Sequence, residues 1–120
     1  MMMIINRFFS TIKNTSARQL IEKTVKENNI VVFMKGTPSQ PMCGYSRAVC
    51  QILDMNKVRV YEAVNVLEDE QVREEIKAFS NWPTIPQVFV KGAFIGGCDI
   101  LVDMNKTGEL QKLLAKEGII

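Results

Sequence analysis

Residues 30–49, IVVFMKGTPSQPMCGYSRAV, decide the fold that this sequence predicts. The five leading apolar residues indicate a buried strand, and a loop with two prolines separates them from a helix that begins near Tyr45. Cys43 lies at the start of that helix, where free N–H groups and the helix dipole favour the thiolate. A cysteine at position 46 would complete a dithiol redox motif, but Ser46 cannot close a disulfide. We therefore expect Cys43 to react with an outside partner: a small thiol, a metal or another protein.

Around this unit the sequence predicts helices that alternate with strands. A capping box at Ser16-Ala17-Arg18-Gln19 begins a first helix, which ends at Asn28-Asn29. The later elements are a strand at 58–65, a helix containing Val72, Ile76 and Phe79, a hairpin at 87–95 with its turn at Lys91-Gly92, a helix opened by Gly96-Gly97-Cys98-Asp99, and a last helix containing Leu110, Leu113 and Leu114. This order predicts an α/β fold in which helices cover both faces of a four-stranded mixed sheet.

Composition narrows the functional classes. The chain has 120 residues, enough for a single domain, and its 47% hydrophobic and 23% charged residues are typical of a soluble globular protein. Residues 1–19 contain three basic residues and no acidic one, which leaves 12 basic and 13 acidic residues elsewhere. A nearly neutral body gives no electrostatic case for a nucleic acid.

Cysteine usage excludes two further classes. Three cysteines without histidine do not make an ordinary zinc site in one chain, and an odd count argues against a secreted disulfide framework. Cys50, two helical turns after Cys43, is expected to be a buried apolar residue.

The start of the chain, residues 1–16, is basic, free of acids and rich in Ser and Thr, which is typical of a mitochondrial transit segment. Asn6 and Arg7 interrupt its apolar run, so it makes a poor secretory signal and is too short to span a membrane. We expect a folded domain at 17–120 in the mitochondrial matrix, with a merely disordered start as the alternative.

Three separate features are expected to converge on one pocket. The first is the Cys43 loop, and the second is Thr84-Ile85-Pro86, where a cis proline bond would expose the backbone of Ile85 to an extended peptide. The third is Gly96-Gly97-Cys98-Asp99, a helix start whose N–H groups suit a carboxylate. A thiol-bearing peptide with an acidic end fits these features, and glutathione has that form.

The sequence resembles the monothiol glutaredoxins with a Cys-Gly-Phe-Ser motif, in particular the mitochondrial single-domain members. The resemblance covers about residues 17–115, and four motifs in the order and spacing of the family carry it. They are Lys35-Gly36-Thr37-Pro38, Cys43-Gly44-Tyr45-Ser46, Trp82-Pro83-Thr84-Ile85-Pro86-Gln87 and Gly96-Gly97-Cys98-Asp99-Ile100. One departure is that Tyr45 stands where most members have Phe. The aromatic ring is kept, so binding of the iron–sulfur cluster that the resemblance implies is expected to survive.

The resemblance implies a thioredoxin-like fold, glutathione as a ligand and a [2Fe–2S] cluster that bridges a homodimer. Cys43 would be the catalytic cysteine and the cluster ligand, with one glutathione bound to each subunit. By position, the residues that would contact glutathione are Lys35, Tyr45, Arg73, Thr84, Ile85, Cys98 and Asp99. Lys35 would pair with the glycine carboxylate, Arg73 would add a second cation, and Ile85 would offer its backbone. The amides of Cys98 and Asp99 would take the γ-glutamyl carboxylate.

Several functions remain open at this point. The leading hypothesis is a carrier that accepts a cluster from iron–sulfur assembly proteins and passes it to apo-protein acceptors; the long loop at 36–42 favours it within the resemblance. The alternative is a monothiol glutathione-dependent oxidoreductase that removes glutathione from mixed disulfides. If the protein is a carrier, we expect at most weak oxidoreductase activity. A third is a sensor that acts with a BolA-like protein. Cys98 would lend only its amide or act as a second redox thiol, Trp82 is expected to be a structural anchor, and neither nucleic acid nor membrane is expected as a partner.

Overall fold

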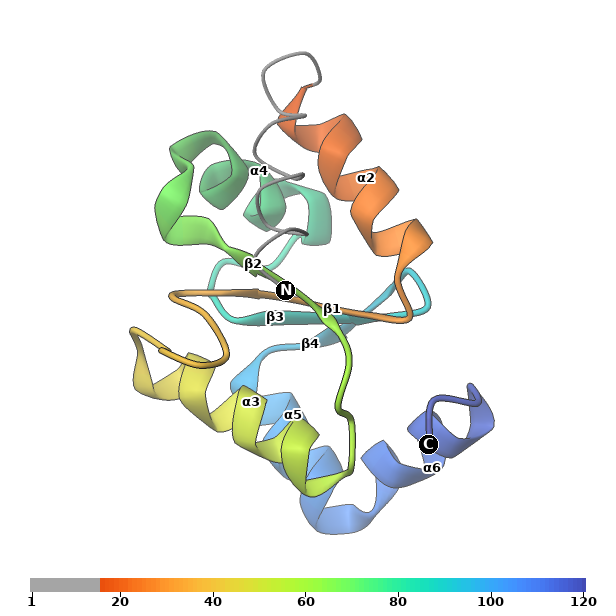
Figure 1. Ribbon diagram of the computed structural model, residues 1–120. Helices are drawn as coiled ribbons and strands as arrows, with labels where there is room; N and C mark the ends of the chain where they lie inside the picture. Colours follow the sequence, from red (N-terminus) through yellow and green to blue (C-terminus); the bar gives the residue numbers. More distant parts are fainter. Residues whose placement is uncertain (1–15) are drawn as a thin grey trace.

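The computed structural model describes residues 16–120, which form one sheet covered by helices (Figure 1). In chain order the elements are α2 (Ala17–Glu27), β1 (Ile30–Met34), α3 (Gly44–Met55), β2 (Glu62–Asn65), the 3-10 turn η1 (Val66–Glu68), α4 (Glu70–Ser80), β3 (Gln87–Val90), β4 (Ala93–Gly96), α5 (Cys98–Thr107) and α6 (Glu109–Lys116). The predicted transit segment lies outside the described residues except for Ser16, so it stays a prediction. None of the helices within 16–120 combines the length and apolar character needed to span a bilayer.

The sheet has four strands in the order β2-β1-β3-β4, which confirms the predicted mixed sheet. β1 pairs in parallel with β2 and antiparallel with β3, and β3 pairs antiparallel with β4. The predicted turn of this hairpin is also confirmed: Lys91 and Gly92 both have positive φ, as a two-residue hairpin turn requires. All five residues of β1 are buried, because a central strand with helices on both faces has no side toward solvent.

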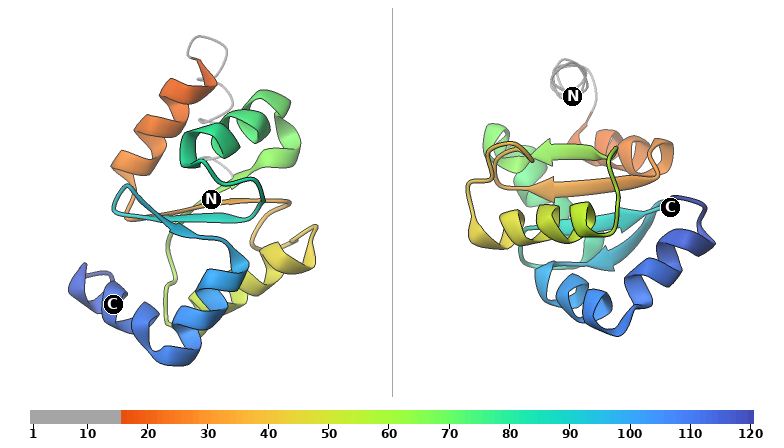
Figure 2. Two further views of the ribbon diagram at one scale, coloured as in Figure 1. Left: turned by 180° about the vertical axis from the view of Figure 1, so that it is seen from behind. Right: turned by 60° about the horizontal axis from the view of Figure 1, so that its bottom comes forward.

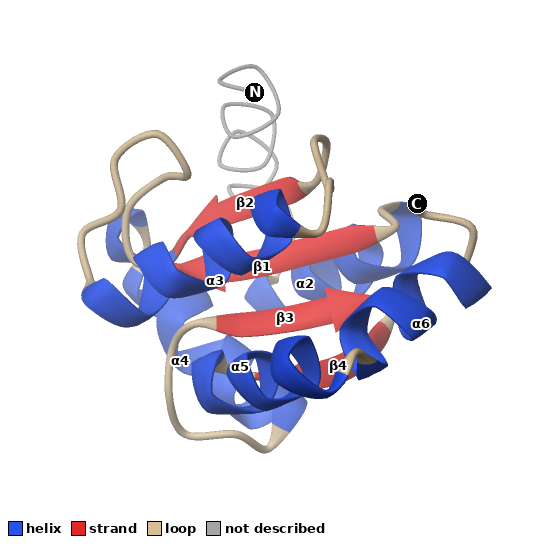
Figure 3. Ribbon diagram, turned by 90° about the horizontal axis from the view of Figure 1, so that it is seen from below, coloured by secondary structure: helices blue, strands red, loops and turns tan. Residues whose placement is uncertain are grey.

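Successive side chains of β1 divide between two hydrophobic cores. Val31 and Phe33 belong to the core under α2 and α4, whereas Ile30, Val32 and Met34 belong to the core under α3, α5 and α6. Figures 1 and 2 show α2 and α4 on one side of the sheet, and Figure 3 shows α3, α5 and α6 on the other. The apolar run at 30–34 therefore contributes side chains to both cores.

The first helix begins as its sequence predicts. The Ser16 hydroxyl accepts from the Gln19 backbone N–H, and the Gln19 side chain accepts from the Ser16 N–H, so both halves of the capping box form. Its buried face consists of the four residues expected from their spacing: Leu20, Ile21, Thr24 and Val25.

The second strand is shorter than the predicted 58–65. Glu62 pairs with Val31, so residues before position 61 run past the beginning of β1 and have no strand beside them. The Val58 N–H instead donates to the Leu53 carbonyl (2.9 Å) at the end of α3, and Val60 is 82% exposed. The prediction was wrong over this segment because apolar alternation does not reveal where the neighbouring strand begins.

Candidate functional site

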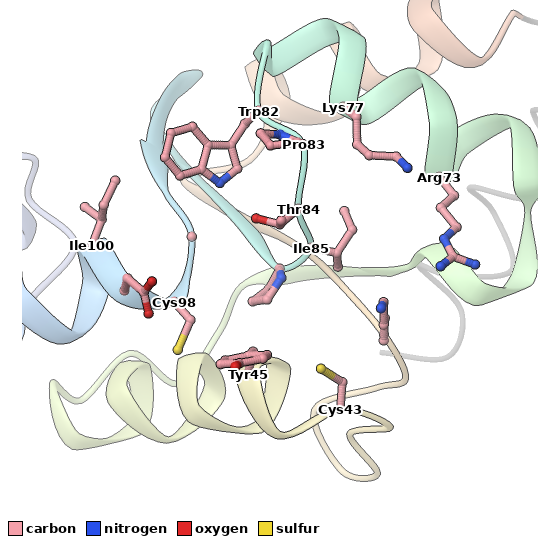
Figure 4. Close-up of a pocket in the computed structure, with 14 residues that line it drawn as sticks. Cys43, Tyr45, Arg73, Lys77, Trp82, Pro83, Thr84, Ile85, Cys98 and Ile100 are labelled. Carbon is pink, nitrogen blue, oxygen red and sulfur yellow. The ribbon is translucent and has the colours of Figure 1, made fainter.

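A cleft of about 560 Å³ lies where the end of β1, the start of α3, α4, the segment 82–86 and the start of α5 meet (Figure 4). Every residue that the sequence analysis assigned to the site lines it: Lys35, Cys43, Tyr45, Arg73, Thr84, Ile85, Cys98 and Asp99. Six further residues complete the lining: Lys77, Trp82, Pro83, Pro86, Gly97 and Ile100. The expected convergence of three separate segments is therefore found in the fold.

Cys43 is the N-cap residue of α3 and has an extended backbone (φ −156°, ψ 139°). Its thiol is partly exposed and points toward the cleft in Figure 4. A hydrogen bond from the backbone N–H of Ser46 lowers the pKa of the Cys43 thiol, and partial burial opposes that effect. The Tyr45 N–H, the charge of Lys35 and the Ser46 hydroxyl lower the pKa further. Cys43 therefore has the thiolate-stabilising surroundings that a helix start provides.

Ser46 connects the two segments on either side of the proline loop. Its side chain is completely buried (0% exposed), and its Oγ accepts from the Lys35 backbone N–H at 3.1 Å. The Lys35 carbonyl in turn accepts from the Met42 N–H at 2.9 Å. Ser46 thus fixes the end of β1 against the first turn of α3. The sequence did not indicate this role, because there Ser46 was noted only as the residue in place of a second cysteine.

Gly36 is required for the tight path of the loop. Its φ is +92°, and a Cβ there would come within 2.5 Å of the Gln40 carbonyl oxygen and 2.6 Å of the Met42 nitrogen. The Gly36 N–H donates to Asn65 Oδ1 (3.0 Å), which also accepts from the Leu67 N–H (3.0 Å). The loop before Cys43 is therefore anchored to the end of β2.

The Thr84-Ile85-Pro86 segment forms a second wall of the cleft that contains Cys43. The Ile85-Pro86 bond is cis, as predicted. Within residues 16–120 the backbone N–H and C=O of Ile85 have no hydrogen-bond partner. Both groups are thus available to an extended peptide in the cleft.

The start of α5 closes the cleft on a third side. Gly97 is its N-cap and supplies no side-chain cap, so the first amides of the helix are left for a ligand. A Cβ at Gly97 would lie 3.0 Å from the Pro86 carbonyl oxygen and 3.3 Å from Trp82 Nε1, so glycine lets this helix start approach the 82–86 segment closely. Burial, followed by the charges of Asp99 and Cys43, raises the pKa of the Cys98 thiol. Cys98 is thereby less ionised than Cys43.

Three cations line the cleft, one more than the sequence analysis assigned. Lys35 and Arg73 have no ion-pair partner within residues 16–120, whereas Lys77 Nζ lies 3.1 Å from a carboxylate oxygen of Glu74. Lys77 follows Arg73 by one helical turn on α4, and Figure 4 shows both side chains at the same wall. The spacing of four residues on a helix was the signal that could have identified Lys77.

Trp82 packs against Phe94 with ring centroids 5.7 Å apart, as expected of a structural anchor, and it also lines the cleft. The expectation for Cys50 was wrong. Cys50 is only half-buried rather than buried, because it faces a second groove of about 450 Å³ beside Tyr61. Its Sγ lies 3.8 Å from Met34 Sδ, and burial raises the pKa of its thiol. Cys50 is therefore outside the cleft and less ionised than Cys43.

The fold and the cleft define a class: a thioredoxin-like protein with one favourably ionised cysteine at a helix start. The glutaredoxin family model matches residues 30–95. Glutaredoxin-related protein 5, mitochondrial, of Danio rerio is 56% identical over 106 residues, covering 88% of this chain and 68% of that protein. Monothiol glutaredoxin-5, mitochondrial, of Schizosaccharomyces pombe is 52% identical over 103 residues, covering 84% of this chain and 70% of that protein.

Solved structures agree with these relatives. The solution structure of a monomeric truncated mutant of Trypanosoma brucei 1-C-Grx1 superposes with a TM-score of 0.78 at 38% identity, covering 88% of this chain and 94% of that chain. The crystal structure of a buckwheat glutaredoxin–glutathione complex gives a TM-score of 0.76 at 28% identity, covering 87% and 92%. The chain belongs to the glutaredoxin family, among the monothiol members that are named mitochondrial.

Proposed function

We propose that this protein is a glutathione-dependent carrier of [2Fe–2S] clusters. It receives the cluster as cargo from iron–sulfur assembly proteins in the mitochondrial matrix and transfers it to apo-protein acceptors. The observation that carries the proposal is the Cys43 thiol, favoured as thiolate and open to a cleft with the polar groups that glutathione requires.

The cleft offers a partner for each part of glutathione. The free backbone groups of Ile85 suit its extended peptide, and the amides at the start of α5 suit the γ-glutamyl carboxylate. Lys35, Arg73 and Lys77 suit the glycine carboxylate at the other end. Glutathione bound in this way brings its own thiol beside Cys43. The buckwheat relative, whose structure is described as a glutathione complex, supports the choice of ligand.

The number of available thiolates favours cluster transfer with a dimer. A [2Fe–2S] cluster takes four thiolate ligands. Cys50 faces a different groove, and the proposal assigns to Cys98 its backbone amide rather than its thiol, so each chain contributes Cys43 as its thiolate. Two chains with one glutathione each then supply four, and the cluster bridges a homodimer. A BolA-like protein is a further partner that the proposal includes.

Anaerobic reconstitution with iron, sulfide and glutathione tests the proposal. We expect a coloured species of about twice the apo mass that forms only when glutathione is present. Cys43→Ser should abolish the cluster, whereas Cys50→Ser, the same change at the thiol in the second groove, should retain it. A stable cluster without an external thiol would refute glutathione as co-ligand. Rapid reduction of small glutathione mixed disulfides by a colourless monomer would favour the oxidoreductase instead.

A further inference from the structure

Gln87 is an amide buried directly behind the wall of the cleft. It is the first residue of β3, follows Pro86, and its side chain is 0% exposed. A buried amide destabilises a fold unless hydrogen bonds satisfy it, so its partners indicate why it is present.

The two amide N–H groups of Gln87 are both used within the cleft wall. Nε2 donates to the Trp82 carbonyl at 3.0 Å and to the Thr84 carbonyl at 3.2 Å. Its Oε1, by contrast, is buried without a partner among the described residues. An unpaired buried acceptor is unfavourable, and an apolar side chain of similar size would avoid it. The donors are therefore the part of the side chain that the fold uses.

The bond to Thr84 determines the direction of a neighbouring donor. The Thr84 C=O and the Ile85 N–H belong to one planar trans peptide unit, so they point in opposite directions. Gln87 holds the Thr84 oxygen toward its own buried amide, so the Ile85 N–H points the other way, and Ile85 itself lines the cleft. The second bond, to Trp82, fixes the same segment two residues earlier.

We propose that Gln87 is a positioning residue for the peptide-binding edge of the cleft. It holds the backbone carbonyls of Trp82 and Thr84 inward and so orients the Ile85 N–H for a thiol-bearing peptide. The inference rests on the proposed function for the ligand, glutathione, but the orientation of the wall is a property of the free protein. The two parts can thus be tested separately.

Trp82 makes the test direct, because it is the single tryptophan of the chain and its carbonyl is one of the two acceptors. In Gln87→Met, acrylamide should quench Trp82 fluorescence more strongly than in the wild type, without any ligand. Affinity for reduced glutathione, followed by NMR titration, should fall about tenfold, as expected when a pair of hydrogen bonds no longer orients the wall. The pH midpoint of Cys43 alkylation should not change, because Gln87 does not contribute to the pKa of Cys43.

Thr24→Val is the matched control. It also removes a buried hydrogen bond, from Thr24 Oγ1 to the Leu20 carbonyl (2.7 Å), but within α2 and away from the cleft. It should leave quenching and glutathione affinity at wild-type values. Equal effects of the two variants on affinity, or wild-type quenching in Gln87→Met, would overturn the inference.

Two further measurements separate the possible failures. In the wild type, hydrogen exchange of the Gln87 Nε2 protons should be slow, and fast exchange would overturn the inference even if Gln87→Met does not fold. A wild type that does not bind glutathione, but whose Trp82 becomes exposed in Gln87→Met, would refute the proposed ligand and support the positioning role.

Discussion

Replacing Ser46 by alanine should weaken the fold and the active thiolate together. The Ser46 hydroxyl is 0% exposed and accepts the Lys35 N–H at 3.1 Å, and it also lowers the pKa of Cys43. Ser46→Ala leaves that N–H without its acceptor at a partly buried position. Loss of one partner of such a bond costs about 1–3 kcal/mol of unfolding free energy. For a domain of this size the melting temperature should fall by roughly 5–15 °C.

Ser46→Ala should also raise the pKa of Cys43, but only by a small part of the lowering that its surroundings produce. The backbone N–H of Ser46, the largest contribution to the lowered pKa, remains in the variant, and only the hydroxyl contribution is lost. The pKa of Cys43 should therefore rise part of the way toward that of a free thiol. Iodoacetamide alkylation across pH, with the modified cysteine identified by mass spectrometry, measures the midpoint.

Ser39→Ala is the control for both measurements. Ser39 lies exposed in the same loop, where its hydroxyl forms a hydrogen bond with Thr37 Oγ1 at 3.2 Å. This change should shift the unfolding free energy by less than about 0.5 kcal/mol. If Ser46→Ala matches Ser39→Ala in melting temperature and in alkylation midpoint, Ser46 fixes neither the Lys35 backbone nor the thiolate.

Three other changes test the rest of the cleft. Lys35→Glu should weaken glutathione binding and raise the pKa of Cys43, because it places a negative charge beside a thiolate and a carboxylate; unchanged calorimetric affinity and alkylation midpoint would remove Lys35 from the site. Gly36→Ala should cost about 3 kcal/mol or more in urea unfolding, since φ is +92° and the new Cβ meets backbone atoms, whereas Gly44→Ala, which meets nothing within 4 Å, should be neutral or stabilising. Cys98→Ser should retain a reconstituted cluster, because the α5 amide remains; loss of the cluster spectrum in a folded variant would make Cys98 a required thiol.

The sequence predicted what depends on local chemistry. The capping box at Ser16, the hairpin turn at Lys91-Gly92 and the buried run of β1 follow from the residues themselves, and all three are confirmed. The eight candidate site residues also meet at one cleft: seven belong to motifs at the ends of strands and helices, and Arg73 lies near the start of α4. Their roles toward glutathione and a cluster stay predictions.

What the sequence left out depends on which distant atoms meet. In the sequence, Ser46 indicated only that a second cysteine is missing from the motif. The fold reveals that its hydroxyl accepts a hydrogen bond from the Lys35 backbone, eleven residues earlier. Gln87 was quoted only as the last residue of a family motif. The fold reveals that its side-chain amide donates to the backbone carbonyls of Trp82 and Thr84. Cys50 was expected to be buried because free cysteines usually are, but it lines a groove together with Arg59 and Tyr61 and is only half-buried.

The two walls of the cleft thus recognise a ligand by different physical means. Gln87 holds the backbone carbonyls of Trp82 and Thr84 in fixed directions, so the peptide edge needs little ordering when a ligand arrives. Lys35, Arg73 and Lys77 act through charge, and added salt screens charges at a solvent-accessible cleft. Glutathione affinity should therefore fall with ionic strength in the wild type and in Gln87→Met by the same factor, because the cations are intact in both. Lys35→Glu should flatten that dependence, since attraction and repulsion then partly cancel. A titration series in sodium chloride separates the two means; a flat salt response in the wild type would assign recognition to the backbone wall alone.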